Sequence, residues 1–169
     1  MATVKLEGFA ELEAALDQLS KAAGKGVLRR SLIKSAEPMA EIARALAPDD
    51  TTSSGFDLKR SIKVGTRLSR GEKKAHRKMF RNDKAAVEVF MGAGPLPQAI
   101  YTEFGTSPFI NKGKLAGTHN PGIRAQPYMR PAWEQDRRAM LSRLSDELWA
   151  ELSKSIQRAE RKASRQARG

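Results

Sequence analysis

The chain is organised around Tyr101-Thr102-Glu103-Phe104-Gly105-Thr106 and a later stretch, Ala125-Gln126-Pro127-Tyr128-Met129-Arg130-Pro131-Ala132-Trp133. The first stretch sets two aromatic residues around one carboxylate and ends in a glycine that can adopt a positive φ. The second is a rigid aromatic and proline entry into a long amphipathic helix, with Pro131 at a favoured first-turn position. We interpret the two stretches as anchors that hold out the segment between them, which indicates binding or assembly rather than catalysis.

The segment between the anchors, residues 107–124, is rich in Gly, Pro, Asn and Lys and has few residues to bury. A compact domain seldom keeps so long a loop without regular structure unless the loop binds something or stays mobile. We therefore expect an irregular polar arm that is mobile in the free protein and becomes ordered in an assembly.

The two anchors resemble the signature of a tail-component family of long-tailed bacteriophages. The matching pattern is Tyr101-x-Glu103-Phe104-Gly105-Thr106, then Ala125-x-Pro127-Tyr128-Met129-Arg130-Pro131-Ala132. Two upstream fragments follow the family's order, namely Gly8-Phe9-x-Glu11-Leu12 and Ala47-Pro48 with Gly55-x-x-Leu58-x-x-Ser61-Ile62. The chain departs from the pattern in Asp49–Ser54, which lengthens the Pro-to-Gly spacing, and in an unusually basic insert, Leu68–Lys84.

The resemblance implies a structural protein of the virion neck or tail, assembled in the cytoplasm of the bacterial host, that completes the tail and joins it to the head. It implies a ring of identical subunits, sixfold like the tail tube. The implied partners are tail-terminator or tail-tube proteins and head connector proteins. The interface residues that it implies are Tyr101, Glu103, Phe104, Gly105, Thr106, Pro127, Tyr128, Met129, Arg130, Pro131 and Trp133.

Composition limits the other classes of function. The chain has no cysteine and only two histidines, His76 and His119, which are far apart in the sequence. We therefore expect no metal site and no cofactor, and folding in a reducing cytoplasm. No apolar run is long enough to cross a membrane. Residues 1–8 have no apolar signal-peptide core.

The formal net charge of +12 favours polyanionic partners. The insert carries most of a basic patch whose members are Arg67, Arg70, Lys73, Lys74, Arg77, Lys78, Arg81 and Lys84. A second basic cluster closes the chain within residues 154–168. These groups could hold DNA phosphates, but the aromatic residues that stack on single strands are missing apart from Phe80. We favour acidic surfaces of neighbouring subunits as the partner. A basic nucleic-acid-binding protein is the alternative function, and nonspecific contact with packaged DNA stays open.

Glu103 is the one carboxylate in apolar company, between Tyr101 and Phe104. It has no carboxylate or histidine partner nearby in the sequence, so general acid catalysis is disfavoured. Because burial of an unpaired charge is costly, we expect an ion pair within the chain or between subunits, first with Arg130 and second with Arg124. The chain is accordingly not expected to be an enzyme.

The sequence pattern predicts an α+β fold with long extended loops, in a single domain of residues 1–157 followed by a basic tail of residues 158–169. A short edge strand or an extended arm at Val4–Leu6 precedes a helix from Phe9 to Leu19 that Gly24 and Gly26 end. A second helix runs from Val27 to Leu46, with a kink near Pro38. Alternation predicts antiparallel strands at Ser61–Thr66 and Ala85–Met91, joined by the basic insert with a helical turn around Glu72–Phe80.

The C-terminal half is expected to hold a short helix at Gln98–Phe104 and a long helix from about Pro131, which frays from Ser164. The small antiparallel sheet gains one or two further strands and is packed by the kinked helix and the C-terminal helix. Tyr128 and Trp133 are expected to pack against the sheet or the kinked helix. Truncation of Trp133 to alanine should then cost about 3–5 kcal/mol if its ring is fully buried.

Overall fold

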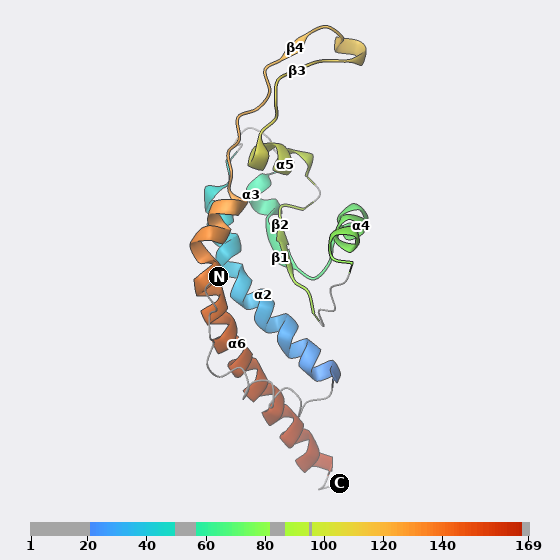
Figure 1. Cartoon of the computed structure of the whole chain (residues 1–169). Helices are drawn as coiled ribbons and strands as arrows, with labels where there is room; N and C mark the ends of the chain where they lie inside the picture. Colours follow the sequence, from blue (N-terminus) through green and yellow to red (C-terminus); the bar gives the residue numbers. More distant parts are fainter. Residues whose placement is uncertain (1–20, 50–56, 82–86, 95, 167–169) are drawn as a thin grey trace.

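Two long helices form the spine of the molecule (Figure 1). The computed structural model describes residues 21–49, 57–81, 87–94 and 96–166. Helices α2 (Lys21–Leu46) and α6 (Met129–Gln166) lie side by side along much of their length. Two small antiparallel sheets and three short helices lie toward one end of this pair. The fold is α+β, as predicted.

The seam between α2 and α6 is built from small and medium side chains. Near the sheet the buried residues of α2 include Met39, Ala40 and Ala43, and Ala132 of α6 joins their cluster. Further along, Val27 packs with Leu148 and Leu152. Alanines let the helix backbones approach closely, so this seam binds through contact over its length rather than through bulky residues. None of the described helices combines the length and the apolar character needed to span a membrane.

A buried carboxylate joins the two helices electrostatically. Glu151 of α6 is 5% exposed, and its oxygens accept hydrogen bonds from Arg30 Nε at 2.6 Å and Lys34 Nζ at 2.9 Å on α2. The hydrogen bonds from Arg30 and then Lys34 outweigh the opposing effect of burial and lower the pKa of Glu151 to about 2. The carboxylate therefore stays ionised over the whole physiological range.

Helix α2 runs without a break through Gly24 and Gly26, so the prediction that these glycines end a helix is wrong. Each glycine costs the helix about 1 kcal/mol relative to alanine. The neighbouring Val27 is fully buried against α6, and this packing offsets the cost. Tertiary contact has overridden local propensity.

Pro38 also lies inside α2, where it cannot donate a backbone hydrogen bond to the preceding turn. Arg143 of α6 makes a hydrogen bond to the turn of α2 that precedes Pro38. Its Nη2 donates to the carbonyl oxygen of Ser35 at 3.0 Å. The same guanidinium donates from Nη1 to Asp136 Oδ1 at 3.0 Å, and Asp136 is buried. The proline turn of α2 is thereby held to α6 through a paired charge.

The main sheet consists of β1 (Lys63–Gly65) and β2 (Phe90–Gly92), antiparallel, with Val64 opposite Met91. The antiparallel pair was predicted, but both strands are shorter than expected. Residues Leu58–Ser61 form a helical turn, α3, because Asp57 accepts a hydrogen bond from the backbone of Lys59 and so caps it. Within the described residues no third strand joins this sheet, so the expected additional strands are not found there.

The segment between β1 and β2 contains helix α4 (Arg70–Met79), which confirms the expected helical turn and extends it. A capping box starts the helix: Ser69 Oγ accepts from the backbone of Glu72, and Glu72 Oε2 accepts from the backbone of Ser69 at 2.8 Å. Helix α5 (Pro97–Phe104) was also predicted, and it ends at Gly105 with a φ of 70°.

The two aromatic residues of the second anchor have different surroundings. Tyr128 is 2% exposed and belongs to the core cluster with Met39 and Ala99, as predicted. Trp133 is 49% exposed, so its ring is not fully buried. Its side chain lines a cavity of about 460 Å³ between α2, β2 and α6. Truncation of Trp133 should therefore cost less than the value for a fully buried ring.

The remaining expectations concern the end of α6 and residues that the structure does not describe. Helix α6 reaches Gln166, so the expected fraying at residues 164–166 is wrong. The described residues do not include the segment predicted at Val4–Leu6, the helix predicted at Phe9–Leu19, residues 50–54 of the lengthened Pro-to-Gly spacing, or Lys84 of the basic patch. Of the upstream family-like fragments, Ala47-Pro48 and Leu58–Ile62 are described.

Substitution of Glu151 by glutamine should lower the free energy of unfolding by about 1–3 kcal/mol at pH 7, because buried charge-assisted hydrogen bonds are lost. The pKa of Glu151 is depressed in the folded state, so its stabilisation is full above the ordinary carboxyl pKa and is lost as pH falls toward 2. Urea unfolding of both chains between pH 7 and pH 2 should show the difference shrinking.

The matched control is Glu147→Gln, which removes a more exposed carboxylate bonded to Lys34 at 3.2 Å. Exposed pairs of this kind contribute about 0–1 kcal/mol. Equal effects of the two substitutions would contradict the special role of Glu151.

Candidate assembly interface

The two anchor motifs meet at one carboxylate. Glu103, on the last turn of α5, reaches the start of α6 and accepts three backbone hydrogen bonds there. Its Oε2 accepts from Tyr128 N at 2.8 Å and Met129 N at 2.9 Å, and its Oε1 accepts from Arg130 N at 3.0 Å. A carboxylate at this position neutralises the positive end of the helix dipole. We call this contact the Glu103 cap.

Pro131 completes the Glu103 cap. The first turn of a helix leaves its N–H groups without partners inside the helix, and Pro131 has no N–H to satisfy. Ala132 N is the next donor, and it reaches Tyr128 O at 3.4 Å. The motif therefore satisfies the whole first turn of α6 with one distant side chain and one proline.

The expected ion pair between Glu103 and a side chain of Arg130 or Arg124 is wrong for the described residues, because Glu103 pairs with backbone N–H groups instead. Partial burial alone would raise the pKa of Glu103, but the backbone hydrogen bonds of Met129, Tyr128 and Arg130, with the charge of Arg130, outweigh it and lower the pKa. Arg130 acts through its backbone and its field.

Further contacts lock α5 to the start of α6. The backbone N–H of Gln126 donates to Thr102 O at 2.7 Å. The Tyr128 hydroxyl lies 3.5 Å from the carbonyl oxygen of Ala99, and burial, followed by the charge of Glu103, raises the pKa of Tyr128. Chain segments 25 residues apart are thus joined through backbone and side chain together.

A β-bridge with a glycine beside each strand forms the base of the segment between the two anchors. Thr106 and Ile123 form an antiparallel bridge, with N···O distances of 2.9 and 3.2 Å. Gly105 and Gly122 flank the bridge at φ values of 70° and 78°. A Cβ on Gly105 would lie 2.6 Å from Ile123 O, and a Cβ on Gly122 would clash with Thr106 O. Only glycine fits both positions.

Residues 107–124 are not the irregular arm that the sequence suggested. They contain a second antiparallel pair, β3 (Phe109–Ile110) with β4 (His119–Asn120), and a 3₁₀ turn at Gly113–Leu115. The prediction missed it because both strands are two residues long. Asn111 and Thr118 extend the pairing, since Asn111 N donates to Thr118 O and Asn111 Nδ2 donates to Thr118 Oγ1, both at 2.9 Å.

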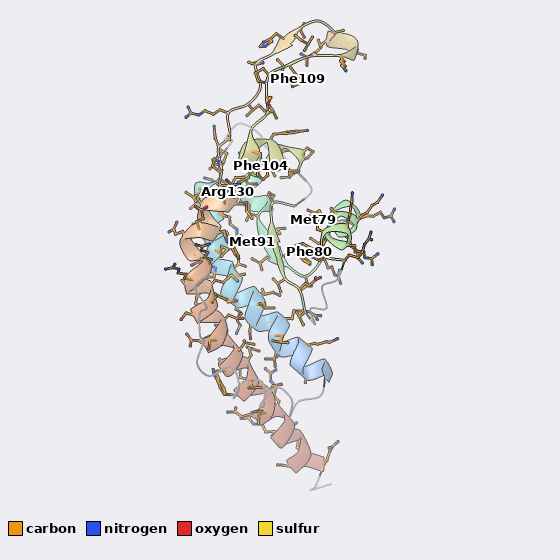
Figure 2. The ribbon with its side chains drawn as sticks, in the orientation of Figure 1. Met79, Phe80, Met91, Phe104, Phe109 and Arg130 are labelled. Atoms are coloured by element: carbon orange, nitrogen blue, oxygen red, sulfur yellow. The ribbon has the colours of Figure 1, made fainter. Side chains whose placement is uncertain are left out.

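The hairpin projects beyond α5, away from the main sheet (Figure 1). Its apolar side chains are uncovered: Phe109, Ile110 and Leu115 are each at least half exposed, and Leu115 is 64% exposed. Figure 2 shows Phe109 on the hairpin and Phe104 on α5 below it. Exposed apolar residues gathered on a projecting element are typical of an interaction surface.

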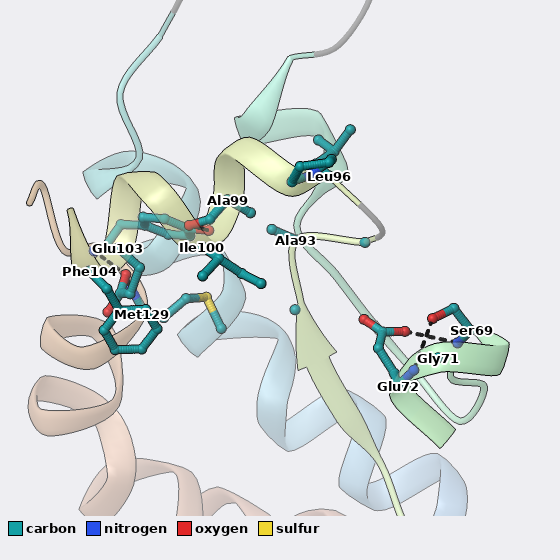
Figure 3. A pocket seen from close by; sticks show the side chains of 14 residues that line it. Ser69, Gly71, Glu72, Ala93, Leu96, Ala99, Ile100, Glu103, Phe104 and Met129 are labelled. Atoms are coloured by element: carbon teal, nitrogen blue, oxygen red, sulfur yellow. Dashed lines mark hydrogen bonds between the residues drawn. The ribbon is translucent and has the colours of Figure 1, made fainter. Parts of the chain in front are cut away.

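A groove runs along the other side of α5 (Figure 3). It has a volume of about 580 Å³ and lies between α5, the turn after β2, the start of α4 and the start of α6. We call it the α5 groove. Its lining is largely apolar and includes Ala93, Leu96, Pro97, Ile100, Phe104 and Met129.

The charged residues of the α5 groove are of one sign. Glu72 and Glu103 line it, and no lysine or arginine stands among its described lining residues. Hydrogen bonds from the Ser69 side chain and then the Ser69 backbone lower the pKa of Glu72, as the backbone bonds do for Glu103. Both carboxyl groups are therefore negative at neutral pH.

The basic patch lies largely on α4 and is exposed, as expected. Arg67, Arg70, Lys73, Lys74, Arg77, Lys78 and Arg81 are all exposed, and none pairs with a carboxylate among the described residues. The basic end of α6 lies apart from α4, so the two clusters do not merge (Figure 1).

Sequence reasoning missed the residue that holds α4 to the sheet. His76 packs against Phe80 at 4.8 Å and edge-on against Phe90 of β2 at 5.2 Å between ring centroids. Its Nε2 lies 3.5 Å from Glu88 Oε1. The signal in the sequence was a lone histidine four residues before a phenylalanine, on one helix face.

The remaining motif residues lie around the same junction. Tyr101, Phe104 and Pro127 are exposed, Met129 is half-buried in the α5 groove, and Arg130 is exposed beside Trp133. Comparison of the chain with protein-family models, with curated proteins and with solved structures finds no match.

Replacement of Glu103 by alanine should lower the free energy of unfolding by about 1–3 kcal/mol, because three N–H groups at the start of α6 lose a charged acceptor. The pKa of Glu103 is lowered by folding, so this stabilisation is full above the ordinary carboxyl pKa and is lost as pH falls through the lowered value. Chemical unfolding at pH 7 and near pH 3 measures both effects.

Glu134→Ala is the control, since Glu134 is exposed on the same helix and its side chain makes no hydrogen bond to another described residue. Exposed substitutions of this kind change stability by about 0.5 kcal/mol or less. A Glu103 variant as stable as the Glu134 variant would show that the cap contributes little.

Gly122→Ala should open the base of the hairpin, because the new Cβ would meet Thr106 O at a backbone conformation that alanine avoids. We expect faster amide hydrogen exchange at Thr106 and Ile123, with the protection of the α2–α6 seam retained. Gly65→Ala is the matched control, since a Cβ there meets nothing within 4 Å. Unchanged exchange at the bridge would refute the account of Gly122.

Proposed function

We propose that this chain is a structural subunit of the neck or tail of a long-tailed bacteriophage. It completes the tail end and joins the tail to the head as one member of a ring, which we propose to be sixfold. Its partners are the tail-terminator or tail-tube proteins and the head connector, and its place is the virion after assembly in the host cytoplasm. Its role is mechanical rather than catalytic.

The observation that carries this proposal is the Glu103 cap. The residues of the two anchors that resemble the tail-component family lie at or beside the junction where α5, the hairpin and α6 meet. The carboxylate of Glu103 is occupied by three backbone donors, which suits positioning and not proton transfer to a substrate. The junction holds out a hairpin, as an assembly element requires.

The distribution of apolar surface supports the same proposal. The hairpin, the outer face of α5 and Trp133 expose large apolar side chains on the half of the molecule that carries the motif. The core itself contains many alanines and few bulky residues. A chain that leaves its large side chains outside gains stability when neighbours cover them.

A second candidate is a basic nucleic-acid-binding protein, favoured by the seven exposed cations on and around α4. Such a surface can neutralise phosphates and release counterions. Contact with DNA that passes through a neck would use the same residues. The two functions are therefore distinguished by the defect seen in particles made without this chain.

The test is electron microscopy of particles made without this chain in a phage that encodes it, with purified protein added back. Separate filled heads and finished tails, which join on addition of the protein, are the expected result. Intact infectious particles in its absence would overturn the proposal. Joined particles with unstable packaged DNA would favour the nucleic-acid function.

Replacement of Lys73, Lys74, Arg77 and Lys78 by glutamine should leave unfolding nearly unchanged, because α4 buries none of its residues. Assembly with acidic partners should weaken, most strongly at low salt, since exposed charges act over about 8–10 Å at ordinary ionic strength. Mass measurement of complexes across a salt series, with tail proteins and separately with DNA, distinguishes the partners.

The matched control removes four other exposed cations from the two long helices: Lys25, Arg29, Arg137 and Arg138. It has the same net charge as the α4 variant. Equal losses would mean that only total charge matters, and normal assembly of the α4 variant at every salt concentration would reduce the patch to a solvated surface. If DNA is the partner, the slope of log affinity against log salt falls by about 0.9 per lost phosphate contact.

A further inference from the structure

We infer that the tip of the β3–β4 hairpin of one copy docks into the α5 groove of a second copy. The inference deepens the proposed function by naming the contact between neighbouring subunits, and it rests on that proposal only in requiring that copies assemble. It identifies both halves of the interface on a single chain.

The hairpin needs a cover that its own chain does not provide. An isolated two-stranded hairpin is marginally stable in water, and both residues of β3 are exposed. Leu115 at the tip and Phe109 and Ile110 on the strand present apolar surface. The described residues add no third strand to either edge, so backbone groups are available there as well.

The α5 groove offers a matching apolar floor. Ile100 and Phe104 are 63% and 68% exposed along it, and Leu96 and Met129 are half-buried deeper in it. Figure 3 shows Ile100 and Leu96 of the α5 segment with Ala93 between them and the start of α4. Its volume of about 580 Å³ lies in the range of sites that accept several side chains.

The charges of the two surfaces are complementary. From Phe104 to Trp133 the sequence contains no Asp or Glu, and the hairpin tip carries Lys112 and Lys114 at its 3₁₀ turn. The groove is lined by Glu72 and Glu103 and by no cation among its described residues. The cations of α4 are exposed, and none of them lines the groove. Opposite charges around an apolar contact fix its register.

Docking within one copy conflicts with the geometry. The Thr106–Ile123 bridge, Gly105 and Gly122 fix the base of the hairpin, which then extends beyond α5 away from the main sheet. The groove lies on the sheet side of α5. A tip that cannot turn back must enter another copy. Such a contact is heterologous, tip to groove, and it generates a ring when the rotation between copies closes.

Disulfide trapping tests the contact directly, because the chain has no cysteine of its own. Leu115→Cys places a thiol at the hairpin tip and Ile100→Cys places one in the groove. Each variant carries one thiol, and one of the two is labelled with a heavy nitrogen isotope so that mixed dimers are separated by mass. A disulfide forms only when the two Cα atoms approach within about 7 Å.

Mixing the two variants under mild oxidation should give the tip-to-groove disulfide adduct about tenfold or more above the control, because docking raises the local thiol concentration. The control mixes Leu115→Cys with Arg158→Cys, an exposed site near the far end of α6. In an otherwise unchanged chain, Leu115→Asp should weaken self-assembly without changing the melting temperature of the dilute monomer, since Leu115 is exposed.

The outcomes separate the inference from the proposed function. An adduct at the control level overturns the inference, and if the unchanged chain still forms a closed ring by mass, the ring proposal stands without it. An adduct well above control supports the contact even if particles lacking the chain turn out to be intact, in which case the neck function fails.

Discussion

The carboxylate of Glu103 joins α5 to the start of α6, at the point from which the hairpin projects. The N–H groups that begin α6 have no partner inside the helix, and Glu103 of α5 accepts three of them while Pro131 removes the fourth donor. Because the acceptor comes from a different helix, α6 can begin only where α5 ends. The hairpin between them must then leave from this junction, and the Thr106–Ile123 bridge with Gly105 and Gly122 fixes its base.

The rest of the molecule is a rigid support for that junction. The α2–α6 seam packs small residues over a long distance, and its polar groups are matched in pairs: Arg30 and Lys34 with Glu151, and Arg143 with Asp136. Among the described residues no buried side-chain nitrogen or oxygen lacks a hydrogen-bond partner. A seam with matched charges specifies one register of the two helices, since any slip would leave a buried charge unpaired.

Charge and apolar surface are distributed differently over the molecule. The cations gather on α4, the hairpin and the end of α6. Most of the exposed large apolar residues lie on α5, the hairpin and α6, and Met79 and Phe80 lie at the end of α4. The hairpin and the end of α4 belong to both sets. Electrostatic attraction acts at longer range and governs encounter, and apolar contact governs retention once surfaces meet. We therefore propose that α4 captures acidic partners and that the hairpin makes the stable contact between copies.

Features that depend on neighbouring residues could be predicted from the order of the amino acids. Apolar periodicity indicated α2 and α6, alternation indicated β1 and β2, the composition of the insert indicated α4, and the glycine after Phe104 indicated the end of α5. The two anchor motifs, which meet at the Glu103 cap, were identified in the same way.

Other features follow only from tertiary contacts. These contacts determine which groups Glu103 binds, and they explain why Tyr128 is buried while Trp133 is half exposed. They also explain why α2 continues through its two glycines. They also pair residues 107–124 as a hairpin. Each of these features depends on a partner distant in the chain, whose packing or hydrogen bond outweighs a local preference of about 1 kcal/mol.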